Sequence, residues 1–153
     1  MFRILSFATL LLSTAAFGAM PEMGNGYGAI DAPRDTDPVT LAERFCAARI
    51  SGDMTPLQPF FAPKLKRLLD GLPEPGAAPW QGYIDRPTAC DVEVVNGYDD
   101  TIGVLVRVTY TSAERRWADT LNFERTPDSW RLNNVFYEQG GNLRFRLIEG
   151  TNG

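Results

Sequence analysis

Histidine is absent from this sequence of 153 residues. It is the side chain most often used as a general base and as a ligand of transition metals. Without it, neither a Ser-His-Asp nor a Cys-His nucleophile can be built. A metal site that relied on the two cysteines would lack further soft ligands. We therefore expect no metal centre and no cofactor.

Apolar runs long enough to span a bilayer are also lacking. The apolar stretch Ile4–Leu12 follows the basic residue Arg3 and precedes the mostly small residues 13–19. It is shorter than a membrane-spanning helix needs, and its layout is typical of a secretory signal peptide. The pattern predicts that residues 1–19 are removed on export, that no stable membrane anchor remains, and that the mature protein is periplasmic or secreted.

An excess of basic charge is missing too. Lys and Arg number 15 against 19 Asp and Glu, which gives a net charge of −4 at pH 7. Nucleic acids and anionic membranes are bound through a basic face. The charge balance argues against nucleic acid as a partner and suits a soluble exported protein.

Cysteine occurs only twice, at Cys46 and Cys90. In an oxidising compartment an even pair is expected to form a bridge. The bridge would close a loop of about 45 residues and, in the chain-entropy description, stabilise the fold by roughly 4 kcal/mol. The alternative is a pair of buried thiols.

A single domain is predicted at 37–150, after a flexible leader at 20–36 that is rich in Gly, Pro and Asp. Asp37 followed by Pro38 is a helix start, since it joins a capping carboxylate to a proline in the first helical position. Apolar residues then recur on one side until Gly52, which is suited to end the helix.

Two further helix starts and a change of period follow. Thr55-Pro56 predicts a short helical turn, and Ala62-Pro63 predicts a second amphipathic helix that closes at Gly71. Later the apolar residues alternate with a period of two, which predicts four strands. The alternating series are Cys90–Val94, Ile102–Tyr110, Trp117–Phe123 and Trp130–Phe136.

Turn residues between neighbouring strands indicate an antiparallel meander. Residues 143–148 fit either a last strand or a helical turn capped by Asn142, and both remain open. Helices first and a sheet afterwards predict an α+β domain, in which N-terminal helices pack on a curved antiparallel sheet of four to five strands.

Two segments near the C-terminus add to this order of elements. They are Trp130-Arg131-Leu132-Asn133-Asn134-Val135-Phe136-Tyr137 in the late strand and Gly140-Gly141-Asn142-Leu143-Arg144 after it. With them, residues 37–148 resemble the cone-shaped superfamily of nuclear transport factor two and ketosteroid isomerase, and most of all its small exported bacterial members. The resemblance implies a cone or cystatin-like roll. It is compatible with a homodimer, because this fold often pairs through its sheet. It implies no catalytic residue, since the fold hosts enzymes and binding modules alike.

Three polar residues fall on faces that we assign to the core. They are Asp119 in the third strand, Asn134 in the fourth, in phase with Phe136, and Arg49 in the apolar arc of the first helix. We interpret them as the lining of a pocket between sheet and helices, where Arg49 would hold an anionic ligand and Asp119 would accept a proton. The alternative is an Arg49–Asp119 ion pair, or a bulge that turns Asp119 outward.

Two aromatic residues, Trp80 and Tyr83, lie in the long connection rich in Pro and Gly before the first strand. Long ordered connections are often functional. Trp80 and Tyr83 are therefore candidates for a lid or a partner-contact patch. The alternative is that they plug the open end of the cone.

Three classes of function fit the sequence. The preferred one is a non-catalytic exported module that binds a small molecule or an envelope protein. The second is an isomerase or dehydratase of the ketosteroid-isomerase type, which would use Asp119 with Tyr110 or Tyr137. The third is a secreted inhibitor or immunity-type protein with an exposed aromatic patch. A cavity that contains Asp119 would favour the first two, and a packed interior would favour the third.

Overall fold

Three helices, a short 3-10 helix and four strands make up the described part of the chain. The computed structural model describes residues 36–74, 78–95 and 103–150. The elements are α1 (Pro38–Ser51), η1 (Thr55–Phe60), α2 (Pro63–Asp70), β1 (Ala89–Val94), β2 (Val104–Thr111), β3 (Arg116–Arg125), β4 (Trp130–Tyr137) and α3 (Leu143–Gly150). The predicted signal peptide, the leader up to residue 35 and the predicted strand start at Ile102 lie outside the described residues.

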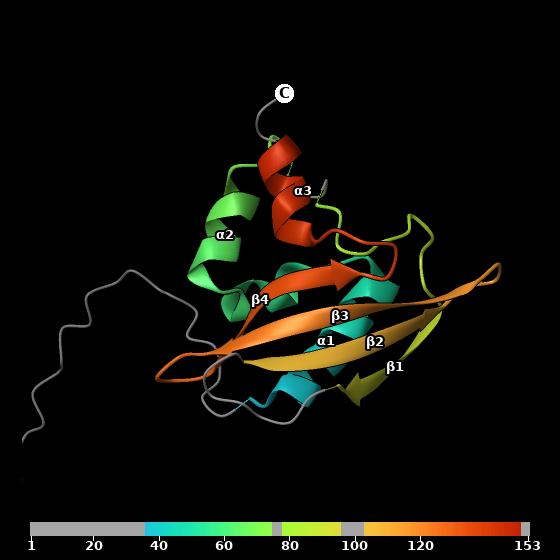
Figure 1. Cartoon of the computed structure of the whole chain (residues 1–153), viewed down its shortest axis with the longest axis horizontal. Helices are drawn as coiled ribbons and strands as arrows, with labels where there is room; N and C mark the ends of the chain where they lie inside the picture. The colour runs from blue at the N-terminus through green and yellow to red at the C-terminus, as the bar shows by residue number, and fades with distance from the viewer. Residues whose placement is uncertain (1–35, 75–77, 96–102, 151–153) are drawn as a thin grey trace, which may run out of the picture.

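The four strands form one open antiparallel sheet in the order β1-β2-β3-β4 (Figure 1). This confirms the predicted α+β class and the four-stranded antiparallel sheet. In β2 and β3 every second residue is buried, as period-two alternation requires of a sheet with one covered face. The buried series supplies much of the hydrophobic core.

Helix α1 lies behind the sheet in Figure 1 and contacts β1 and β2. Its start is the predicted one, because the Asp37 carboxylate accepts hydrogen bonds from the backbone N–H groups of Val39 (2.9 Å) and Thr40 (3.1 Å), with Pro38 in the first turn. It ends at Gly52, whose φ of 81° lies in the left-handed region where a glycine is favoured.

Helices α2 and α3 contact each other and β4 (Figure 1). Residues 143–148, for which strand and helix were both open, belong to α3. Its first turn is capped by Asn142, whose Oδ1 accepts a hydrogen bond from the backbone N–H of Phe145 at 3.0 Å. A capping side chain therefore decided between the two alternatives.

The phase predicted for the end of β4 is wrong. The β3–β4 register shifts between Asn122 and Phe123, so that Asn133 lacks a partner in the β3–β4 register and the strand contains a bulge. Beyond it the inward positions are Val135 and Tyr137, and Phe136 is 42% exposed. One extra residue in a strand reverses which face the following side chains occupy, and this irregularity has no signature in the alternation itself.

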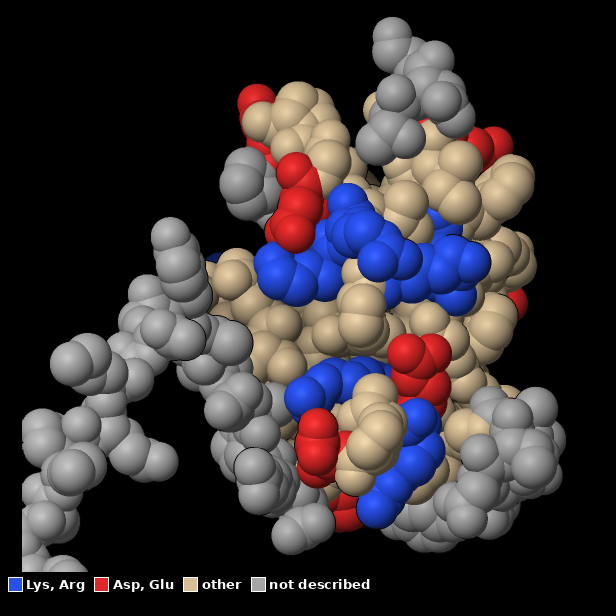
Figure 2. Space-filling view, turned by 90° about the vertical axis from the view of Figure 1, so that its left-hand side faces the viewer, with Lys and Arg blue, Asp and Glu red and all other residues tan. Residues whose placement is uncertain are grey.

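Positive charge is unevenly distributed over the surface. Seen from the side on which α2 lies, Lys and Arg side chains gather in a band, with Asp and Glu beside it (Figure 2). Helix α2 presents three exposed basic side chains, Lys64, Lys66 and Arg67. A chain of net negative charge therefore carries a band of basic side chains on the face shown, with acidic side chains around it.

Candidate functional site

A pocket of about 280 Å³ lies between the C-terminal end of α1, η1 and α2. Its walls combine apolar and polar side chains, with Phe61, Leu69 and Trp80 among the first and Arg49, Gln58 and Lys66 among the second. Asp119 does not line it, so the cavity lies beside the position expected from the sequence.

The aromatic wall of the pocket is firmly packed. Trp80 is 6% exposed and stacks on Phe61, with ring centroids 5.2 Å apart, while Phe45 meets it edge-on at 6.2 Å. Both contacts have the geometry that aromatic pairs prefer. The pocket therefore has a preformed apolar surface.

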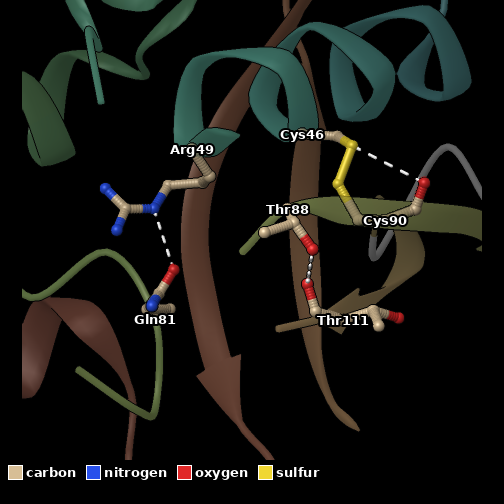
Figure 3. The surroundings of a disulfide bond; sticks show 6 residues. All are labelled: Cys46, Arg49, Gln81, Thr88, Cys90 and Thr111. Atoms are coloured by element: carbon tan, nitrogen blue, oxygen red, sulfur yellow. Dashed lines mark hydrogen bonds between the residues drawn. A yellow bond between two sulfur atoms is a disulfide. The ribbon is translucent and has the colours of Figure 1, made fainter. Parts of the chain in front are cut away.

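Arg49 is half-buried and supplies a cationic wall. Its Nε donates a hydrogen bond to Oε1 of Gln81 at 3.0 Å, and Gln81 in turn donates to the backbone carbonyl of Asp85. The terminal nitrogens of Arg49 make no hydrogen bond or ion pair with a residue that the structure describes, and in Figure 3 they point away from the disulfide. Burial lowers the pKa of Arg49, yet a guanidinium stays charged in proteins. Arg49 thus has unused donors beside a cavity.

The other charges around the pocket are engaged. Lys66 pairs with Asp70 one turn further along α2, at 3.0 Å. Asp53 accepts a hydrogen bond from the backbone N–H of Thr55 at 2.9 Å, and hydrogen bonding from Thr55 lowers the pKa of Asp53. Arg86, close behind Gly52, donates to the carbonyls of Ile50 (2.9 Å) and Ser51 at the end of α1. Among these groups, Arg49 is the one whose two terminal nitrogens both lack a hydrogen-bond partner among the described residues.

Asp119 is 1% exposed and lies on the core face of β3, as its phase indicates. Its oxygens accept hydrogen bonds from the backbone N–H groups of Gly82 (2.9 Å) and Glu138 (3.1 Å). Burial raises the pKa of Asp119, and the two backbone hydrogen bonds act in the opposite direction. The carboxylate fastens the connection before β1 to the end of β4.

Neither alternative for Asp119 is found. The carboxylate does not turn outward, and no ion pair joins it to Arg49 among the described residues. The fit around Gly82 is close, because a Cβ at this position would lie 3.1 Å from Oδ1 of Asp119 and 3.2 Å from Nε2 of Gln139, and both side chains would have to shift by a few tenths of an ångström. The hydrogen bonds from the backbone replace the ion pair that the sequence suggested.

Tyr110 and Tyr137 are both buried but differ in their partners. The hydroxyl of Tyr137 donates to the carbonyl of Pro79. The hydroxyl of Tyr110 and Nε1 of Trp117 make no hydrogen bond with any described residue, although the two rings stack at 5.2 Å. Burial raises the pKa of Tyr110, and the neighbouring charges of Asp119 and Arg49 act on it in opposite directions.

Four of the five predicted pocket residues thus lie in one region. Arg49, Tyr110, Asp119 and Tyr137 are close enough for their charges to influence one another's pKa. Asn134 is separate from them. Its Oδ1 accepts hydrogen bonds from the backbone N–H of Val135 (3.0 Å) and of Arg144 (3.1 Å), and its Nδ2 donates to Asn142. Asn134 therefore holds the start of α3.

The aromatic residues of the connection do not form an exposed patch. Trp80 belongs to the hydrophobic core. Tyr83 is half-buried, meets Trp117 edge-on at 5.7 Å, and carries the guanidinium of Arg115 over its ring at 4.9 Å. The prediction that Trp80 and Tyr83 form an exposed partner-contact patch is therefore wrong, because both side chains pack onto the domain.

Gln81 is the functional candidate that the sequence did not reveal. It accepts a hydrogen bond from Arg49 and is buried, and in the sequence it stands between Trp80 and Tyr83. The feature of the sequence that could have pointed to Gln81 is its place in a long connection with embedded aromatic residues. A lone glutamine carries no pattern of its own.

The predicted disulfide between Cys46 and Cys90 is confirmed, with Cα atoms 6.1 Å apart (Figure 3). It joins α1 to β1, one helical turn before Arg49. Disulfides persist in oxidising compartments, so the bridge is compatible with an exported protein.

Two features are absent from the described residues. No three Cys, Asp or Glu side chains there gather closely enough to hold a metal ion. No helix in the same ranges has the length and apolar character needed to cross a bilayer.

Comparisons with protein-family models, with curated proteins and with solved structures gave no match for this chain. The superfamily resemblance therefore stays a prediction.

Proposed function

We propose that this protein is an exported, non-catalytic binding module for a small molecule, with its binding site in the pocket between α1, η1 and α2. The cone-shaped architecture of the nuclear transport factor two superfamily is part of the same proposal. The observation that carries it is a preformed cavity beside Arg49, a half-buried cation whose terminal nitrogens have no hydrogen-bond partner among the described residues.

The size and lining of the pocket support a small ligand. Ligand pockets usually enclose about 300–1,000 Å³ and join apolar walls to a few placed polar groups. A cavity of about 280 Å³ lies just below that range. It suits a molecule smaller than a typical drug.

The state of Asp119 supports a non-catalytic role. An isomerase of the ketosteroid-isomerase type would need a carboxylate that reaches a substrate proton directly or through one water. Here both oxygens of Asp119 accept backbone hydrogen bonds, and Asp119 does not line the pocket.

Export is supported by the sequence and by the disulfide. The N-terminal pattern is that of a signal peptide. The Cys46–Cys90 bridge suits an oxidising compartment. A periplasmic or secreted location follows.

The test is to fill the pocket. Leu69→Trp places a larger side chain on the lining, whereas Leu68→Trp makes the same change one residue earlier, at a half-buried position outside the pocket. A library of small fragments is screened by ligand-observed NMR against the full chain. We expect fragments that bind the parent protein and the Leu68→Trp variant to lose binding to Leu69→Trp. The proposal fails if no fragment binds, or if both variants retain the same binders.

A further inference from the structure

The pocket has a chemical preference that can be read from its unused hydrogen-bonding groups. Resting on the proposed function, we infer that its ligand is a small apolar monocarboxylate, whose carboxylate is held by the terminal nitrogens of Arg49 and whose apolar part lies against Trp80 and Phe61.

The geometry of Arg49 favours a carboxylate. With Nε bound to Gln81, the guanidinium is fixed in orientation and keeps its two terminal nitrogens as a pair of parallel donors. Two parallel N–H groups match the two oxygens of a carboxylate, and such charge-assisted pairs are about twice as strong as neutral hydrogen bonds. No side chain of the described protein supplies the matching acceptors, since Asp119 is held by backbone groups.

The charge balance favours a single negative charge. Four charged side chains line the pocket. Lys66 pairs with Asp70, and the carboxylate of Asp53 accepts a hydrogen bond from the backbone N–H of Thr55, so Arg49 is the one lining cation without an ion-pair partner among the described residues. One unengaged cation balances one negative charge, while a doubly charged phosphate would need more. The band of basic side chains in Figure 2 adds a favourable field for an approaching acid.

The apolar walls of the pocket indicate what the uncharged part of the ligand should be. Trp80, Phe61 and Leu69 offer a flat aromatic surface and an aliphatic side chain. An aromatic or branched-aliphatic group attached to the acid would cover them. A bare anion such as acetate would leave that surface unused.

Matched acids and amides give a direct test. The full chain is titrated calorimetrically with 3-phenylpropionate, 4-methylpentanoate and indole-3-acetate, each beside its uncharged amide. We expect at least one acid to bind about 10-fold more tightly than its amide, since a charged hydrogen-bonded pair is worth about one factor of ten or more. Equal affinities in all three pairs, or no binding by any acid, would overturn the inference.

Variants separate the inference from the proposed function. Arg49→Gln should weaken binding of the acid more than that of the amide and so remove the preference, and Arg49→Lys, which keeps the charge but not the paired donors, should give an intermediate preference. Lys64→Gln is the matched control, because that exposed cation lies on the same helix but does not line the pocket, and should keep the preference. If Leu69→Trp abolishes binding but acid and amide bind equally, the pocket stands and the carboxylate preference is wrong. If Leu69→Trp leaves binding unchanged, both are wrong.

Discussion

Arg49 and Asp119 are two charges in the same interior that end in opposite states. The carboxylate of Asp119 accepts two backbone hydrogen bonds and joins two segments of the chain. The guanidinium of Arg49 makes one hydrogen bond, to Gln81, and faces a cavity with its remaining donors unused. A buried charge whose bonds are all made within the protein serves the fold, whereas one with spare bonds beside a cavity is available to a ligand.

The largest expected effect concerns the bridge near Arg49. Replacing Cys46 and Cys90 together by alanine should lower the free energy of unfolding by about 4 kcal/mol, because the bridge restricts the unfolded chain. Urea unfolding of parent and variant measures the difference. A loss below about 1 kcal/mol would mean that α1 is held to the sheet by packing alone, so that the position of Arg49 does not depend on the bridge.

Asp119 and Arg49 should then differ in what their removal costs. Asp119→Ala leaves two backbone N–H groups without their acceptor and should lower the free energy of unfolding by about 3 kcal/mol. Arg49→Gln removes one hydrogen bond and one desolvated cation and should cost about 1 kcal/mol. Thermal or urea unfolding measures both changes in the free energy of unfolding. A larger loss for Arg49→Gln than for Asp119→Ala would mean that Arg49, and not Asp119, is the charge that stabilises the fold.

The two buried tyrosines differ in a similar way, because only the hydroxyl of Tyr137 has a hydrogen-bond partner among the described residues. Tyr137→Phe removes a hydrogen bond to Pro79 and should destabilise by about 1 kcal/mol. Tyr110→Phe removes a hydroxyl that has no partner among the described residues and should stabilise by up to about 1 kcal/mol. Each variant lacks one oxygen atom of the parent protein. Urea unfolding of the parent and of both variants measures the two changes in the free energy of unfolding. Equal losses would show that the Tyr110 hydroxyl is hydrogen-bonded in solution.

The smallest effect is the pH dependence that Asp119 contributes. Burial raises its pKa above 3.8 in the folded protein, so the folded state holds this proton more tightly than the unfolded chain. Stability from this group is therefore present at low pH and is lost as the pH rises from about 3.8 through the folded-state pKa. Relative to Asp119→Asn, which does not titrate, the parent should lose stability over that window in urea unfolding. A relative gain would mean that the backbone hydrogen bonds outweigh burial.

Much of the fold could be predicted from local patterns. Asp37-Pro38 and Gly52 mark the two ends of α1 because capping and left-handed backbone are properties of single residues. The strands of the meander follow from two-residue alternation. The bulge in β4 could not be predicted, because it changes the pairing of strands without changing their composition.

The site was predicted in part. Phase identified Arg49 and Asp119 as buried charges, but it gave no way to tell which would be satisfied. That depends on backbone groups of Gly82 and Glu138, brought from distant parts of the chain. The same holds for Gln81, whose role rests on a contact across 32 residues of sequence.

The most direct test of the pocket is a nitrogen-proton NMR spectrum of the full chain titrated with 3-phenylpropionate. We expect the Nε–H signal of Arg49 and the indole N–H signal of Trp80 to shift together, since both side chains line the pocket. The indole signal of Trp130, whose ring lies against Arg125 outside the pocket, should stay in place. Shifts at Trp130 with Arg49 and Trp80 unchanged, or no shifts at millimolar acid, would contradict it.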